Sequence, residues 1–130
     1  MRTIWTNGCF DVIHAGHIAM LSYARSLGDR LVVGIDSDVR VKQLKGSSRP
    51  INDQAARETV LRAIRCVDDV IIFNNAAELR QSVINCEASL IVVGDDYMGR
   101  DVIGADIVPV TFFKRLPGLS STWVVDALRL

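Results

Sequence analysis

The sequence contains few cysteines, and their placement excludes a fold built on disulfides. Only three occur, Cys9, Cys66 and Cys86; their number is odd and no two form a CxxC pair. This spacing is typical of neither a disulfide framework nor a zinc knuckle. Reduced thiols are the simplest interpretation, and we expect a cytoplasmic protein.

An excess of charge of either sign is also absent. Fifteen Lys and Arg balance fifteen Asp and Glu, so bulk charge gives no reason to expect a nucleic-acid or membrane partner. No apolar run approaches the length of a membrane span, and Met1 and Arg2 lead directly into a strand-like run, so we expect no signal peptide. No repeat or linker interrupts residues 1–130, which we interpret as one domain.

Short apolar runs alternate with helix-like segments along the chain. Five runs are predicted as strands, at residues 3–6, 31–35, 69–73, 90–93 and 107–113. The segments predicted as helices are 18–27, 39–44, 54–66 and 76–86, with a last helix after Ser120 to Thr122. Residues predicted to point inward from the third and fourth helices are Val60, Leu61, Ile64, Leu79, Val83 and Ile84. This alternation predicts an α/β fold with a Rossmann-like, doubly wound, five-stranded parallel sheet covered by helices on both faces.

The chemically richest stretch, residues 7–17, joins the first strand to the first helix. Its sequence is Asn7-Gly8-Cys9-Phe10-Asp11-Val12-Ile13-His14-Ala15-Gly16-His17. The free N–H groups at the start of a helix attract phosphate, and two histidines three apart share one face there if both lie in the first turn. Such imidazoles can donate hydrogen bonds to phosphate oxygens. Alternatively, each histidine is a helix cap or a packed side chain, or the pair binds a metal ion together with Asp11. No other potential ligand stands at a usual zinc spacing.

Other distinctive residues follow the remaining strands, which is where ligands bind in parallel sheets. Lys42, Lys45 and Arg49 surround Gly46 in a loop of Lys, Gly, Ser and Arg, which suits a polyphosphate or forms an ordinary solvated cluster. Distinctive residues also follow three predicted strands. Asp36 follows the second strand, Gly94 and Asp95 follow the fourth, and the fifth is followed by Arg115, Ser120, Ser121 and Thr122.

Four motifs in this order resemble the cytidylyltransferase-like nucleotidylyltransferases. Residues 14–17 match the HxGH signature with GxFD just before it, and residues 45–52 resemble the KGxSRPxN segment of heptose-phosphate adenylyltransferases. Gly94-Asp95-Asp96-Tyr97 is close to the GDDW of glycerol-3-phosphate cytidylyltransferases, where the heptose enzymes usually have GGDY. Residues 115–122 resemble RTxGIST, but Leu116 replaces its threonine and Pro117 is atypical.

The resemblance implies an enzyme that transfers NMP from an NTP to a phosphate monoester and releases pyrophosphate. His14, His17, Lys45 and Arg115 are then the catalytic residues, and Lys42, Arg49 and Asp36 bind substrate. The residues expected around the nucleotide are Asn7, Gly8, Cys9, Phe10, Asp11, Gly16, Gly94, Asp95, Ser120, Ser121 and Thr122. Asp11 and Asp95 are expected to organise Mg²⁺.

The resemblance leaves the substrates open. Gly94-Asp95-Asp96, Arg115 and the short chain favour CTP and a glycerol-3-phosphate-type acceptor, which is our leading prediction. The segments 7–11, 45–52 and 102–106 favour ATP and D-glycero-D-manno-heptose 1-phosphate. A nucleotide-binding module without catalysis is the alternative of another class. The family also implies a homodimer.

Overall fold

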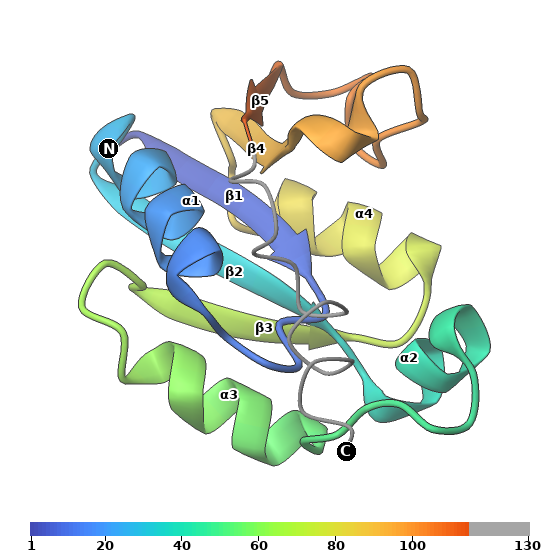
Figure 1. Ribbon diagram of the computed structural model, residues 1–130. Coiled ribbons are helices and arrows are strands. Elements are labelled where there is room, and N and C mark those ends of the chain that lie inside the picture. The colour runs from blue at the N-terminus through green and yellow to red at the C-terminus, as the bar shows by residue number, and fades with distance from the viewer. Residues whose placement is uncertain (115–130) are drawn as a thin grey trace.

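Five parallel strands form the centre of the fold (Figure 1). The structure is a computed structural model that describes residues 1–114. The strands are β1 (Thr3–Gly8), β2 (Arg30–Asp36), β3 (Asp69–Phe73), β4 (Leu90–Gly94) and β5 (Val110–Phe113). They lie in the order β3-β2-β1-β4-β5, and every neighbouring pair is parallel. The predicted parallel five-stranded sheet is confirmed.

Within residues 1–114, four α-helices and one short 3-10 helix connect the strands. They are α1 (Ala15–Ser26), α2 (Asp38–Lys45), α3 (Gln54–Arg62), α4 (Ala76–Asn85) and the 3-10 helix η1 (Asp95–Tyr97). The side chains of Ser37, Asp53 and Asn75 cap α2, α3 and α4 by accepting a hydrogen bond from a backbone N–H of the first turn. Each such cap contributes about 1 kcal/mol and sets where the helix begins.

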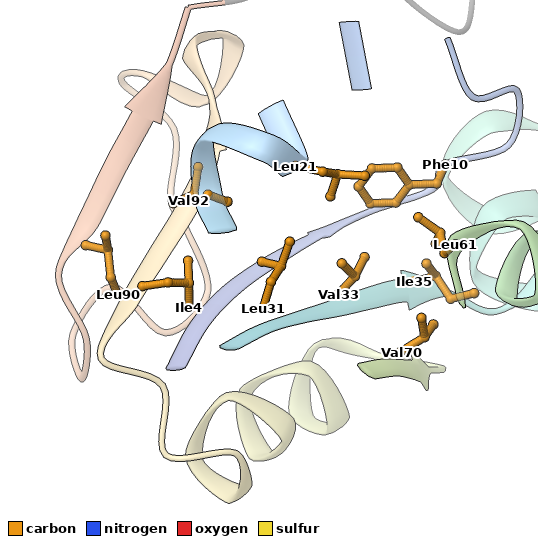
Figure 2. Packing of buried hydrophobic residues seen from close by; sticks show 11 residues of the cluster. Ile4, Phe10, Leu21, Leu31, Val33, Ile35, Leu61, Val70, Leu90 and Val92 are labelled. Carbon is orange, nitrogen blue, oxygen red and sulfur yellow. The ribbon is translucent and has the colours of Figure 1, made fainter. Parts of the chain in front are cut away.

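Hydrophobic clusters lie on both faces of the sheet. On one face, strand residues such as Ile4, Val33 and Val92 pack with Leu21 of α1 and Leu61 of α3. Figure 2 shows this cluster. On the other face, strand residues pack with α4 and with the segment before β5. Burial on both faces explains why the strand sequences are nearly continuous apolar runs.

The absence of a side chain at Gly34 of β2 makes room for the Trp5 ring in the second hydrophobic cluster. Trp5 is fully buried, and a Cβ built on Gly34 would lie 2.4 Å from the Cζ2 atom of Trp5. The missing side chain therefore leaves room for the Trp5 indole, which lies against Gly34 of the neighbouring strand. The Trp5 N–H donates to the Asn7 Oδ1 atom (2.9 Å), which satisfies the polar end of the ring.

The strand order places a topological switch point beside β1. The chain runs outward from β1 through β2 to β3 and then crosses to β4 on the other side of β1. In open α/β sheets, ligands bind at the carboxyl ends of the strands where the order reverses in this way. Figure 1 shows α2 beyond the arrowheads of the strands, at that same edge.

Several predicted element boundaries and inward residues differ from the structure. The first helix begins at Ala15, three residues before the predicted start, and α3 ends at Arg62 instead of position 66. The predictions that Val60 and Ile84 point inward were wrong, because these side chains are 48% and 43% exposed. On α3 the inward partner of Leu61 is Arg57, one turn earlier.

The fifth strand is also shorter than predicted. It begins at Val110 because the preceding residues form a turn in which the N–H groups of Ile107 and Val108 both donate to Gly104 O. Within residues 1–114, none of the helices has the length and apolar character that crossing a membrane requires. The predicted last helix lies outside the described residues, as do Arg115, Ser120, Ser121 and Thr122.

Candidate active site

The two histidines form a reciprocal cap at the start of α1. His14 is the N-cap residue, and its Nδ1 atom accepts a hydrogen bond from the backbone N–H of Gly16 (3.0 Å). The Nδ1 atom of His17 accepts from the backbone N–H of His14 (3.2 Å). The ring centroids lie 4.0 Å apart. The helix geometry therefore holds both imidazoles side by side at its positive end.

These hydrogen bonds also decide which nitrogen carries the proton. Burial lowers the pKa of His14. Burial, the neighbouring His14 and the charge of Lys45 lower the pKa of His17 to about 4. Both rings are consequently neutral at pH 7. Since each Nδ1 accepts a hydrogen bond, the proton of each neutral ring is on Nε2. The Nε2 atom of His14 is buried and has no hydrogen-bond partner within residues 1–114, so it is a donor ready for an acceptor such as a phosphate oxygen.

In the turn before the histidines, the side chain of Phe10 lies in the hydrophobic core and that of Asp11 makes polar contacts with a distant loop. Phe10 has a positive φ of 51° and is 4% exposed; its ring packs near Leu21, as Figure 2 shows, and 5.3 Å from the His17 ring. A Cβ on Gly8 would lie 3.2 Å from the Phe10 ring. The side chain of Phe10 thus supports His17 from behind, and its predicted contact with the nucleotide stays a prediction.

The carboxylate of Asp11 holds the loop that follows the basic segment. It accepts hydrogen bonds from the Nε atom of Arg49 (2.7 Å) and from the backbone N–H groups of Ile51 and Asn52 (both 2.8 Å). The Asn52 side-chain amide donates in return to the Asp11 carbonyl (2.7 Å). We refer to Asp11, Arg49, Ile51 and Asn52 as the loop clasp. It joins the turn after β1 to a segment about forty positions away in the sequence.

Two members of the loop clasp are predicted ligands, Asp11 of a metal ion and Arg49 of the substrate. The Asp11 side chain is fully buried and the Arg49 side chain is 8% exposed. Burial alone would raise the pKa of the Asp11 carboxyl, but hydrogen bonds from Asn52, Ile51 and Arg49 outweigh burial and lower it. Both carboxylate oxygens accept hydrogen bonds from these donors, which gives Asp11 a structural role, and its predicted role as a metal ligand stays a prediction. Arg49 pairs with Asp11 through Nε, while its buried Nη2 atom has no hydrogen-bond partner within residues 1–114, so its predicted substrate-binding role stays a prediction.

A fully buried arginine, which sequence reasoning missed, connects three segments at the same edge of the sheet. Arg57 of α3 donates to the carbonyls of Cys9, Asp36 and Asn52 and to the carboxylate of Asp38. A signal for it exists in the sequence, because position 57 lies one helical turn before Leu61 on the inward face of α3. A charged residue on such a face must find several partners.

Among the other predicted ligands, the two lysines are exposed to solvent and the Asp36 carboxylate is already paired with an arginine. Lys42 and Lys45 are exposed in the last turn of α2, and the charge of Lys45 is near enough to act on both His17 and Cys9. Burial raises the pKa of the Cys9 thiol, and Lys45 only partly opposes this shift. The carboxylate of Asp36 already pairs with the Nε atom of Arg40 (2.7 Å).

The segment after β4 lies next to the turn after β1, because β4 pairs with β1 at Leu90 and Ile91. Gly94 is buried at the end of β4, and Asp95 begins η1. In the part of the chain that the structure describes, no group of three or more His, Cys, Asp or Glu is placed to hold a metal ion. The described residues of the site present the imidazoles of His14 and His17 and the ammonium groups of Lys42 and Lys45, which suit phosphate oxygens.

Comparison with known proteins identifies relatives of the whole chain. The cytidylyltransferase-like family matches residues 5–124. The bifunctional protein HldE of Campylobacter concisus (strain 13826) is 43% identical over 129 residues, covering 98% of this chain and 27% of that protein. The bifunctional protein HldE of Rhodopseudomonas palustris (strain BisB18) is 44% identical over 130 residues, covering 96% and 26%. The chain thus spans about a quarter of the length of these curated relatives.

A solved structure supports the fold. The lipopolysaccharide core biosynthesis protein from Thermoplasma volcanium GSS1 superposes with a TM-score of 0.69 over 89% of this chain and 97% of that one. Its sequence is 24% identical, so this likeness concerns the fold alone.

Proposed function

Since this chain belongs to the cytidylyltransferase-like family of nucleotidyltransferases, we propose that it transfers NMP from an NTP to a sugar phosphate and releases pyrophosphate. The observation that carries the proposal is the pair of neutral imidazoles at the start of α1. Their protons are on Nε2, and the His14 Nε2 atom is buried without a partner among residues 1–114. A phosphate oxygen would satisfy this donor at the positive end of a helix.

The proposed reaction needs no protein nucleophile. An oxygen of the acceptor phosphate forms a bond to the α-phosphorus, and the bond from that phosphorus to the bridging oxygen breaks as pyrophosphate leaves. The protein then acts by positioning and by stabilising negative charge. In this proposal His14 and His17 donate to the α-phosphate, while Lys45 and Lys42 neutralise the triphosphate. Arg115, Ser121 and Thr122 keep their predicted phosphate-binding roles.

We propose ATP and a heptose 1-phosphate as the substrates. The relatives named HldE agree with the resemblance of residues 7–11, 45–52 and 102–106 to heptose-1-phosphate adenylyltransferases. They favour this alternative over the leading prediction of CTP and glycerol 3-phosphate. That second candidate keeps one specific observation in its support, the Gly94-Asp95-Asp96 motif together with Arg115.

Mg²⁺ would enter as the complex with the triphosphate, since nucleotide phosphates hold this ion with few protein ligands. Because the loop clasp occupies Asp11, Asp95 is the carboxylate of the predicted pair that we propose near the ion. A homodimer and a cytoplasmic location also stay proposals. Light scattering of the purified protein would test the first.

The function is tested by pyrophosphate release in a substrate panel. The purified chain is mixed with Mg²⁺, with ATP or CTP, and with D-glycero-D-manno-heptose 1-phosphate or glycerol 3-phosphate. We expect turnover with ATP and the heptose phosphate, and none in a His14→Ala/His17→Ala variant. Turnover only with CTP and glycerol 3-phosphate would reverse the substrate assignment. Nucleotide binding without turnover against either acceptor would favour a binding module and contradict the proposal.

A further inference from the structure

Arg57 engages every nitrogen of its guanidinium group in hydrogen bonds. Its guanidinium is fully buried and makes four hydrogen bonds. The Nη1 atom donates to Cys9 O (3.0 Å) and Asp36 O (2.6 Å), Nε donates to Asn52 O (3.0 Å), and Nη2 donates to Asp38 Oδ1 (2.8 Å). The acceptors lie in three segments, which are the turn after β1, the junction of β2 and α2, and the loop before α3, so one side chain holds these segments together at the carboxyl edge of the sheet.

The geometry of these contacts requires an arginine. A guanidinium presents its donors in a rigid plane, whereas a lysine ammonium presents three donors at one point. A lysine at position 57 would keep the charge and the ion pair with Asp38 but could not reach all three carbonyls. Arg57→Lys would therefore loosen the contacts made by this side chain while α3 keeps its length and charge.

The segments that Arg57 holds carry the histidines and the lysine of the candidate site. Cys9 lies in the turn that leads to His14 and His17. Asp38 is the first residue of α2, and this helix carries Lys45 in its last turn. The charge of Lys45 reaches both His17 and Cys9. Arg57 accordingly bridges the element that bears the lysine and the turn that bears the histidines.

We propose that Arg57, through its ion pair with Asp38, is a positioning residue that sets the place of Lys45 relative to His17. This inference rests on the proposed function, in which Lys45 acts on the triphosphate. A purely structural role for Arg57 would instead lower stability without any special relation to Lys45. The two roles differ in how the effects of substitutions combine, because residues that act through one another are not additive.

The test is a double-mutant cycle between positions 57 and 45. Pyrophosphate release gives kcat/KM for wild type, Arg57→Lys, Lys45→Ala and the double variant, each checked for folding by circular dichroism. We expect Arg57→Lys to lower kcat/KM tenfold or more, since small misplacements of catalytic groups can cost up to about 10²-fold. In the Lys45→Ala background the same change should cost less than about threefold. The matched control is Arg62→Lys, an exposed arginine later on the same helix, which should change kcat/KM in neither background.

Each alternative outcome contradicts the inference in a defined way. An equal loss in both backgrounds would show that Arg57 does not act through Lys45, and no loss would remove it from catalysis. If Arg57→Lys does not fold, Asp38→Asn replaces it in the cycle, because the Asp38 side chain is 30% exposed and its loss leaves the helix cap at Ser37 intact. If wild type shows no turnover, the proposed function fails. The cycle is then measured on ATP affinity by calorimetry, where equal effects in both backgrounds would again overturn the inference.

Discussion

Replacing Asp11 by Asn would show whether this carboxylate is a structural clasp or a metal ligand. The substitution keeps the shape of the side chain and removes its charge. One carboxylate oxygen accepts from Arg49 and Ile51, and the other accepts from Asn52. Whichever oxygen becomes an amide nitrogen, at least one N–H donor then faces another donor. Arg49 also loses its counter-ion at a place where its side chain is only 8% exposed.

The expected loss of stability is large. Removing one partner of a buried ion pair costs about 3–5 kcal/mol, a substantial part of the roughly 5–15 kcal/mol that stabilises a typical domain. With a urea dependence of about 2 kcal/mol per molar, a loss of about 4 kcal/mol lowers the midpoint of unfolding by about 2 M. The assay is urea unfolding at pH 7 without Mg²⁺ or nucleotide, followed by circular dichroism.

Two further variants make this result specific. Asp106→Asn removes an exposed carboxylate that pairs with Arg80, and it should leave the midpoint almost unchanged. Combining Asp11→Asn with Arg49→Met should cost less than the sum of the two single changes, because both remove the same buried pair. A wild-type midpoint for Asp11→Asn, together with loss of Mg²⁺-dependent turnover, would refute the clasp and restore the metal-ligand prediction.

Three other perturbations have expected outcomes. His17→Ala should stay folded and lower kcat by about 10²-fold or more, the scale for losing a donor to a developing charge; near-normal kcat would remove His17 from the mechanism. Acidification should destabilise the protein between pH 6.5 and about 4. In this range His17 of the unfolded chain binds a proton, whereas the buried His17 of the folded protein stays neutral because its pKa is lowered to about 4. Urea unfolding should show a loss of about 2 kcal/mol from this group on going from pH 7 to pH 5, and a His17→Gln variant that loses as much would contradict this origin. Gly34→Ala should lower the free energy of unfolding by about 1–3 kcal/mol, because the new Cβ would lie 2.4 Å from Trp5; an unchanged urea midpoint would show that the indole moves aside freely.

Local sequence patterns determined the fold class of this protein. The apolar runs at residues 31–35, 69–73 and 90–93 became strands with at most one residue added at either end. Continuous β-branched runs bury both faces of a strand, and a parallel sheet provides that environment. The histidine pair was equally visible, because its spacing and its position after a strand are local properties. The resemblance of four motifs then indicated the family, which the match over residues 5–124 confirmed.

Only the tertiary structure decided what the polar residues near the histidines do. Asp11 and Arg49 both have the chemistry of ligands, and nothing in their own segments shows that they are each other's partner across 38 positions. The partners of Arg57 were hidden for the same reason, since its acceptors at Cys9, Asp36 and Asp38 are 19 to 48 positions away and meet it only in the folded chain. Periodicity reports which face of a helix is apolar, but the burial of a charge depends on whether distant backbone carbonyls satisfy it.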